Sequence, residues 1–203
     1  MFMKKGLLAS ALVLPILAMG MGSGTGVLAA ETTGPSNPEI TKTSKASVVV
    51  TPGKLELVAV PDLNFTKVSV SDIATKPYTD SRLASTRFSR VLLNDFRGDS
   101  KGWKLSAKLG NLNSGKNKIN SAQMMLTLGQ TGNKTMPGQL GGYTWLRAGG
   151  NSATLLATSD KSSGSGLGNY KINTTDLRID QQEDIQAGAY TGTMTWTLAS
   201  TGR

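Results

Sequence analysis

The chain contains no histidine and no cysteine, and only three of its 203 residues are tryptophan. Without imidazole or thiol groups it cannot build a Ser-His-Asp or Cys-His nucleophile system, or a zinc site with nitrogen and sulfur ligands. The lack of cysteine also excludes disulfides and a lipid-modified cysteine. Several common enzyme classes are thereby excluded, and we expect a domain stabilised by its core alone. We identify no catalytic residues, no metal site and no cofactor in the sequence, and we expect that the protein is not an enzyme.

A long hydrophobic run occurs only near the N-terminus, and its context indicates export. Lys4 and Lys5 precede the apolar residues 6–19, and small residues at 27–30 suit cleavage by a signal peptidase. The run is shorter than a membrane-spanning helix requires, and Pro15 interrupts it. We predict a signal peptide at 1–30, a secreted protein, and no transmembrane segment after cleavage.

The rest of the chain divides by composition into a tether and a domain. Residues 31–44 are rich in Thr, Pro, Ser and Asn, which is typical of a flexible tether. Residues 45–203 contain short alternating or β-branched runs separated by Gly, Asn, Asp and Ser, as in all-β domains. Strands are expected at 47–51, 54–60, 90–94, 103–109, 122–128, 153–158, 177–179 and 190–198.

The fold expected from these runs is all-β, a single antiparallel β-sandwich with long Gly/Asn/Ser-rich loops. The loops are expected at 110–121, 129–151 and 159–175, and they include Tyr143, Trp145 and Tyr170. Loops of this length in a compact domain are usually functional or mobile. No segment shows a sustained helical period, so no helix is expected.

Basic residues outnumber acidic ones, and the formal net charge is +9. A secreted basic protein is attracted to polyanions, and anionic wall polymers such as teichoic acids are nearer candidates than nucleic acid. The alternative is that the charge only keeps the protein soluble. Either way, no nucleic-acid partner is expected.

Two of the three tryptophans occur in the same tripeptide pattern, as Trp103-Lys104-Leu105 and Trp196-Thr197-Leu198. Each tripeptide lies in a run of strict alternation, so its Trp and Leu share one face of a strand. Packing of that face into the core is the simpler expectation. Stacking of the indole rings on sugar rings is the functional alternative.

Tyr143 and Trp145 have a different context, a glycine-flanked segment that also contains Arg147. Aromatic and basic residues together suit an exposed carbohydrate or protein contact, and a loop that folds back over the sandwich is the alternative. The candidate ligand-binding residues are therefore Trp103, Leu105, Trp196, Leu198, Trp145 and Tyr143.

Three other patterns give weaker indications. The Arg-Gly-Asp at 97–99 matches an integrin-type tripeptide, but so short a motif often occurs by chance. The acidic residues at 176–184 do not have the spacing of an EF-hand, which favours a solvated acidic turn. A glycosidase needs two carboxylates, and only Glu56 and Glu183 are glutamates within the predicted domain, with no local context that marks a catalytic pair.

Three segments resemble the WxL-domain cell-surface proteins of low-GC Gram-positive bacteria. They are GKLELVAVPDLNF at 53–65, VLLNDFRGDSKGWKL at 91–105 and AGAYTGTMTWTL at 187–198. The resemblance spans nearly the whole chain after the predicted signal. It implies binding to cell-wall peptidoglycan, and a membrane-anchored surface protein as a partner.

Two functions are compatible with this resemblance. The first is noncovalent attachment to the wall as an attachment or scaffold domain. The second is a protein-interaction subunit that assembles with a membrane-anchored surface partner and reaches the wall indirectly. Because few residues follow Leu198, we expect no hydrophobic tail, and therefore noncovalent attachment at the cell surface.

Overall fold

The structure is a computed structural model that describes residues 40–85, 87, 89–99, 101–133, 135–158 and 164–201. The predicted signal peptide and residues 31–39 of the predicted tether lie outside this part. The chain divides into two units, Met1–Ser47 and Val48–Arg203. Of the first unit, residues 40–47 are described, and they are exposed and belong to no helix or strand.

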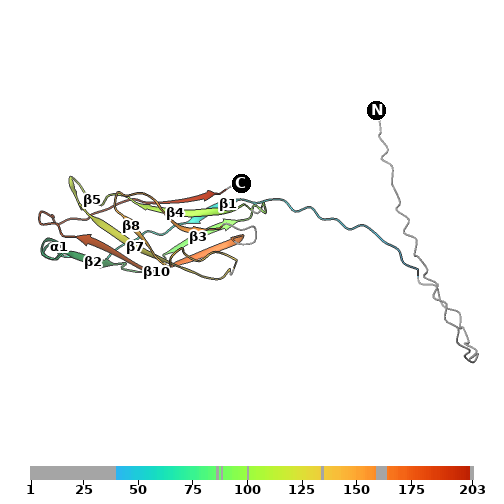
Figure 1. The fold of residues 1–203 in the computed structure, drawn as a ribbon, viewed down its shortest axis with the longest axis horizontal. Helices are drawn as coiled ribbons and strands as arrows, with labels where there is room; N and C mark the ends of the chain where they lie inside the picture. Colours follow the sequence, from blue (N-terminus) through green and yellow to red (C-terminus); the bar gives the residue numbers. More distant parts are fainter. Residues whose placement is uncertain are drawn as a thin grey trace, which may run out of the picture. The chain divides into compact units, whose positions relative to one another are not determined.

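The second unit is an antiparallel β structure (Figure 1), which confirms the predicted fold class. Its elements, in chain order, are β1 (Leu55–Ala59), α1 (Val70–Thr75), β2 (Tyr78–Arg82), β3 (Arg90–Asp95), β4 (Trp103–Leu109), β5 (Asn113–Ser114), β6 (Asn117–Lys118), β7 (Ala122–Gln130), β8 (Thr144–Arg147), β9 (Ala153–Ala157), β10 (Gly166–Asp180) and β11 (Met194–Ser200).

The larger sheet has six strands, and the 15-residue strand β10 organises it. The first part of β10 pairs with β3 and the last part with β2, so β3 and β2 follow one another along the same side of β10. Strand β7 pairs with the other side of β10. β1 pairs with β3 and β8 pairs with β7, which completes the sheet. The register shifts between Ile172 and Thr174, close to the point where β10 changes partner.

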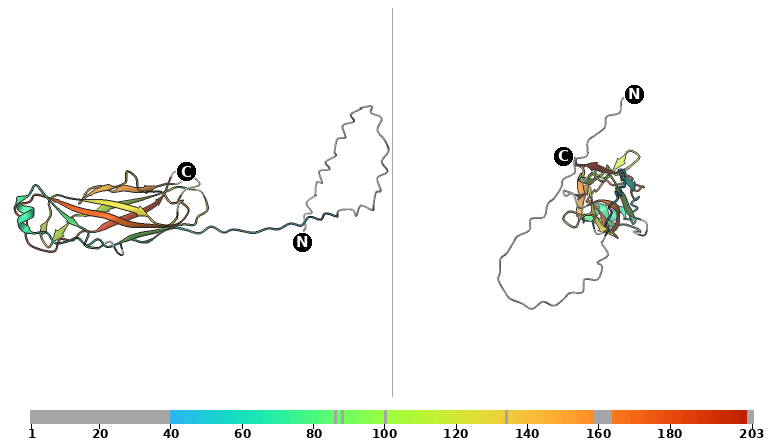
Figure 2. Two further views of the ribbon diagram at one scale, coloured as in Figure 1. Left: turned by 90° about the horizontal axis from the view of Figure 1, so that it is seen from below. Right: turned by 90° about the vertical axis from the view of Figure 1, so that its right-hand side faces the viewer.

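The smaller sheet has three strands in the order β11-β4-β9. Its central strand β4 alternates between buried and accessible residues along its whole length, as expected for a strand that covers a core. Figure 2 shows the strands of both sheets surrounding a common interior. Leu93, Met124 and Leu126 from the larger sheet and Leu105 and Leu156 from the smaller one are buried in one hydrophobic core.

Several expected strands agree with the structure, and others are wrong. β4 has the predicted bounds. Both bounds lie within two residues of the predicted ones in β1, β3, β7 and β9. The predicted strand at 47–51 does not form, because this β-branched run lies exposed, and Val48, Val49 and Val50 are 85 to 87% accessible. The last strand begins at Met194 instead of Tyr190.

All three of the expected long loops contain strands. The segment 110–121 includes the two-residue strands β5 and β6, which pair with each other. The segment 129–151 includes β8, and the segment 159–175 includes more than half of β10. Tyr170 is therefore a core residue with no accessible surface, and its hydroxyl donates to the Pro137 carbonyl at 2.8 Å. The short helix α1 was also not expected. Ser69 caps it by accepting from the Asp72 amide, and six residues are too few to show a helical period.

Candidate functional site

The two Trp-x-Leu tripeptides lie on neighbouring antiparallel strands, β4 and β11. Leu105 is directly opposite Leu198, Trp103 is opposite Ser200, and Trp196 is opposite Ala107. The two leucines therefore meet at the centre of the strand pair, with one tryptophan toward each end. All four side chains point toward the interior between the sheets, so the paired motif forms one wall of the core.

Trp103 is completely enclosed. Its ring has no accessible surface, and its indole N–H donates to the Gly164 carbonyl at 2.9 Å. Its backbone exchanges hydrogen bonds with Thr158, whose hydroxyl accepts from the Trp103 amide at 2.9 Å. Gly164 has a positive φ of 89°, and a Cβ there would lie 2.8 Å from the indole nitrogen. Glycine is thus required where the chain closes over this ring.

Trp196 and Leu198 lie on the edge strand β11 and are only partly buried against the core. The indole nitrogen of Trp196 is nevertheless buried, and it has no hydrogen-bond partner among the described residues. The two tryptophans of the motif therefore differ: one is fully buried with its N–H satisfied, and the other is partly buried with its N–H unpaired. Leu105, like Trp103, has no accessible surface.

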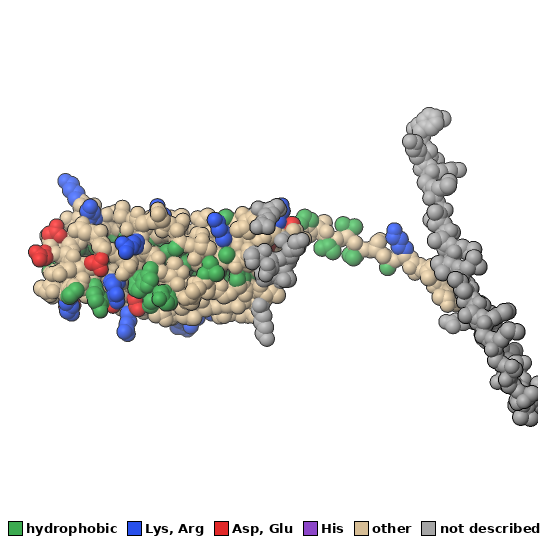
Figure 3. All heavy atoms as spheres, viewed as in Figure 1, with side chains coloured by type: hydrophobic (Ala, Val, Ile, Leu, Met, Phe, Trp, Pro, Cys, Tyr) green, Lys and Arg blue, Asp and Glu red, His purple; other side chains and the backbone are tan. Residues whose placement is uncertain are grey.

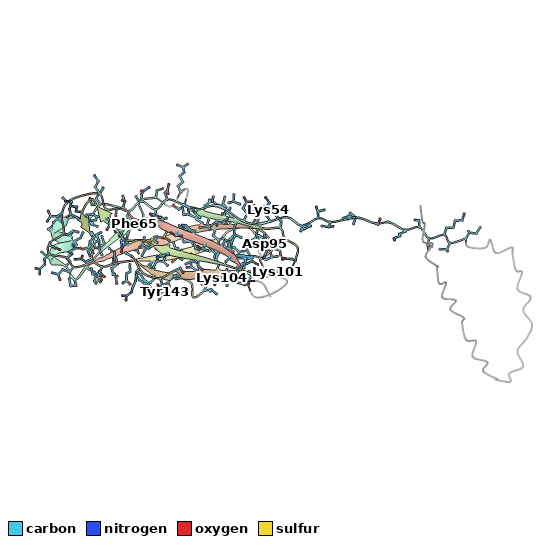
Figure 4. The ribbon with its side chains drawn as sticks, turned by 90° about the horizontal axis from the view of Figure 1, so that it is seen from above. Lys54, Phe65, Asp95, Lys101, Lys104 and Tyr143 are labelled. Carbon is cyan, nitrogen blue, oxygen red and sulfur yellow. The ribbon has the colours of Figure 1, made fainter. Side chains whose placement is uncertain are left out.

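An ion pair stabilises the end of the domain where the first motif begins (Figure 4 labels Asp95 and Lys101). Arg97 donates from Nε to Asp95 Oδ1 and from Nη2 to Oδ2, both at 2.9 Å. The same guanidinium donates to Ser200 Oγ and to the Lys101 carbonyl, each at 2.7 Å. One side chain therefore joins the end of β3, the turn before β4 and the end of β11.

The ion pair has electrostatic and functional consequences. Hydrogen bonds from Arg97 hold the pKa of Asp95 below its usual value, although partial burial opposes this effect. The Asp95 carboxylate in turn raises the pKa of Arg97. Because the side chain of Arg97 is only 13% accessible, the Arg-Gly-Asp at 97–99 serves as a structural turn and does not present a free arginine.

Tyr143 and Trp145 lie on the outer surface of the larger sheet. Trp145 is in β8, not in a loop, and its neighbours Thr144 and Leu146 point toward the core. Trp145 is 38% accessible and Tyr143, just before the strand, is 55% accessible. In Figure 4, Tyr143 lies away from the end of the domain that contains Asp95 and Lys101. These two rings are exposed, whereas Trp103 and Leu105 of the paired motif are fully buried and Trp196 and Leu198 are partly buried.

Trp145 belongs to a surface that the sequence did not reveal, which we call the aromatic face. It consists of outward-pointing residues of β2, β7, β8 and β10: Tyr78, Asp80, Arg82, Gln123, Met125, Trp145, Arg147, Asp176, Arg178 and Asp180.

At the centre of the aromatic face, Arg178 lies between two aromatic rings. Its guanidinium carbon is 4.1 Å from the centroid of the Tyr78 ring and 5.7 Å from that of Trp145. Asp80 orients the guanidinium by accepting from Nε at 2.9 Å and from Nη2 at 3.2 Å. This contact also raises the pKa of Arg178.

The available sequence signal for this face was the alternation in Tyr78–Arg82 and Asp176–Asp180, which places polar and aromatic residues on one side of each segment. The acidic residues Asp176 and Asp180 are part of this surface. In the part of the chain that the structure describes, no three Asp, Glu, His or Cys side chains form a group that could hold a metal ion.

The only helix among the described residues, α1, has six residues, and no described helix is long and apolar enough to cross a membrane. Comparisons with curated proteins and with solved structures give no match. The sequence does match the family described as WxL domain surface cell wall-binding over residues 21–201. That range includes both Trp-x-Leu motifs and every described strand. The chain therefore belongs to the WxL family of surface cell wall-binding proteins.

Proposed function

We propose that this protein attaches noncovalently to peptidoglycan at the cell surface, as an attachment or scaffold domain. The family is a cell wall-binding family and not an enzyme family, which supports the general role. The observation that supports a direct contact is the exposure of Trp145 on the outer side of β8 and of Tyr143 just before that strand. Exposed aromatic rings at such positions can stack on sugars at little conformational cost.

In this proposal the residues predicted to bind ligand separate into two groups. Trp103 and Leu105 have no accessible surface, and Trp196 and Leu198 pack against the core, so these four side chains maintain the fold. Tyr143 and Trp145 contact the wall. The motif that identifies the family and the residues that contact its ligand are therefore different.

Anionic wall polymers are a second component of the proposed attachment. Lys104 and Lys108 alternate with the buried residues of β4, so both lie exposed on the outer surface of the smaller sheet. Two lysines on one strand attract polyanions, and salt weakens this attraction. The aromatic and basic surfaces lie on different sheets and can be tested separately.

The decisive experiment is co-sedimentation of the purified protein with wall sacculi from a strain that lacks any membrane-anchored partner. We expect the protein to pellet, and the double variant Tyr143→Ala/Trp145→Ala to remain largely in the supernatant while melting like the wild type. Repeating the assay after removal of teichoic acids, and at raised salt, measures the contribution of charge.

Failure of the wild-type protein to pellet would refute direct attachment. Pelleting that is restored by a membrane-anchored partner would then establish the alternative function, a subunit that reaches the wall indirectly. The exposed β-branched residues Val48, Val49 and Val50 are the feature that favours such a protein contact. Release of soluble muropeptides in the same assay would show catalysis and contradict a purely binding role.

A further inference from the structure

We propose that the aromatic face binds a neutral sugar chain, and that Tyr78, Arg178 and Trp145 contact successive sugar rings. The inference rests on the proposed wall attachment and extends it in two ways. It names the glycan, and not the peptide, as the part of the wall that is contacted. It also adds Tyr78 and Arg178 to the contact residues.

The first argument is that the two rings are held in place before any ligand binds. Arg178 lies against both rings, 4.1 Å from Tyr78 and 5.7 Å from Trp145, and Asp80 fixes its guanidinium through two hydrogen bonds. The rings are therefore at most 9.8 Å apart, the sum of the two distances, which suits two linked sugar rings. Such preorganisation reduces the entropy lost on binding.

The second argument is that both rings remain accessible although they contact Arg178. Tyr78 is 50% and Trp145 is 38% accessible, so each keeps a surface available for stacking. Strands β2 and β8 hold the two rings, while β10 and β7 lie between them in the sheet. A sheet restricts the backbone at all three contact positions, whereas a loop would not.

The third argument concerns charge. The aromatic face contains three arginines, at 82, 147 and 178, and three aspartates, at 80, 176 and 180, so its formal charge is zero. The whole chain has a net charge of +9. A surface without net charge in a basic protein does not attract a polyanion, but its charged groups can hydrogen-bond to the hydroxyl and amide groups of a neutral ligand.

The fourth argument concerns the distribution of apolar groups. Figure 3 shows hydrophobic, basic and acidic side chains interspersed over the end of the domain that contains α1 and β2. A protein partner would favour a contiguous apolar patch, whereas a sugar presents alternating apolar faces and hydroxyl edges. Gln123, Arg147 and Asp180 of the aromatic face also line a shallow polar cavity, which offers further hydrogen-bonding groups beside the rings.

The test uses a soluble, neutral oligomer of β-linked N-acetylglucosamine, titrated into the purified protein and followed by tryptophan fluorescence and by NMR. We expect chemical-shift changes at the aromatic face and an affinity that does not change between low and high salt. Tyr78→Ala and Trp145→Ala should each weaken binding about three- to tenfold. Arg178→Lys keeps the charge but loses the two-point contact with Asp80, and should also weaken binding.

Phe96→Ala is the matched control, because Phe96 is 49% accessible, like Tyr78, and follows β3 outside the aromatic face. It should leave the affinity unchanged. Wild-type protein that pellets with sacculi but does not bind the oligomer would overturn this inference and leave the proposed function intact. Unchanged affinity in both Tyr78→Ala and Trp145→Ala would overturn it as well, as would binding that is lost at high salt. Failure to pellet with sacculi would instead count against the proposed function.

Discussion

The different environments of the two motif tryptophans predict different responses to the same substitution. Trp103→Phe removes an indole N–H that donates to Gly164, in a site with no accessible surface. Trp196→Phe removes an N–H that is buried and has no partner among the described residues, from a ring that is only partly buried. The chemical change is identical, so any difference in stability reports the environment of each ring.

For Trp103, leaving the Gly164 carbonyl without its donor costs about 1–3 kcal/mol. The smaller ring adds about 1 kcal/mol for the space it leaves, so the free energy of unfolding should fall by about 2–4 kcal/mol. For Trp196, removing an unpaired buried N–H recovers about 1–3 kcal/mol, which offsets a packing loss of about 1–2 kcal/mol. The free energy of unfolding of Trp196→Phe should therefore lie between about 1 kcal/mol below and about 2 kcal/mol above that of the wild type.

Equilibrium denaturation, followed by near-ultraviolet circular dichroism, measures both changes. At about 2–4 °C per kcal/mol, the melting temperature of Trp103→Phe should fall by roughly 4–16 °C. Sedimentation with sacculi at 20 °C should be unaffected in both variants while they remain folded. The reasoning would be refuted by equal losses of stability at the two positions. It would also be refuted if folded Trp103→Phe lost wall binding, because a residue without accessible surface cannot be a direct contact.

Three further predictions concern the ion pair, the turn before β4 and the basic surface. Because the pKa of Asp95 is lowered in the folded state, its pairing with Arg97 stabilises the protein above the unfolded pKa of about 3.9 and is lost as the pH falls below it. Asp95→Asn should thus lower the free energy of unfolding, measured with urea, by about 2 kcal/mol at pH 7 and by clearly less at pH 3. An equal loss at both pH values would contradict this role of the ion pair. Gly102→Ala places a Cβ against the Thr158 carbonyl oxygen and should lower the free energy of unfolding by at least about 2 kcal/mol in the same measurement. Gly138→Ala is the control, because a Cβ at Gly138 has no atom within 4 Å. Lys104→Gln/Lys108→Gln should weaken sedimentation with teichoic-acid-bearing walls about two- to tenfold at low salt and have no effect at high salt, and a loss that persists at high salt would argue against a charge effect.

The strands that could be predicted are those whose sequence alone defines two faces. β4 alternates strictly from Trp103 to Leu109, and its bounds are as predicted because one face lies against the core and the other faces solvent. The run at 47–51 has equally β-prone residues but does not form a strand. Strand formation depends on pairing and on burial of one face, and Val48, Val49 and Val50 have no buried face.

The glycines at the start of β10 are the reason why this part of the strand was wrongly predicted to be a loop. Its first residues, GLGNY, read as a loop, yet Gly168 is a strand residue where a Cβ would lie 3.0 Å from Leu93. Glycine there allows close packing of β10 on β3 and does not mark a turn. Because periodicity contains no information on which strands approach closely, the sequence could not separate this role from that of a loop glycine.

The same limitation explains why the paired motif was found from the sequence and the aromatic face was not. Each Trp-x-Leu is complete within three residues, whereas Tyr78, Trp145 and Arg178 come from three strands that are far apart in the sequence. They are brought together only because β2 and β7 pair with β10 and β8 pairs with β7. A buried motif is also restricted by all the atoms around it, while an exposed ring is restricted only by its ligand. The motif is therefore the stronger marker of the fold, and substitutions on the aromatic face, which leave the core intact, are the ones that can separate wall binding from stability.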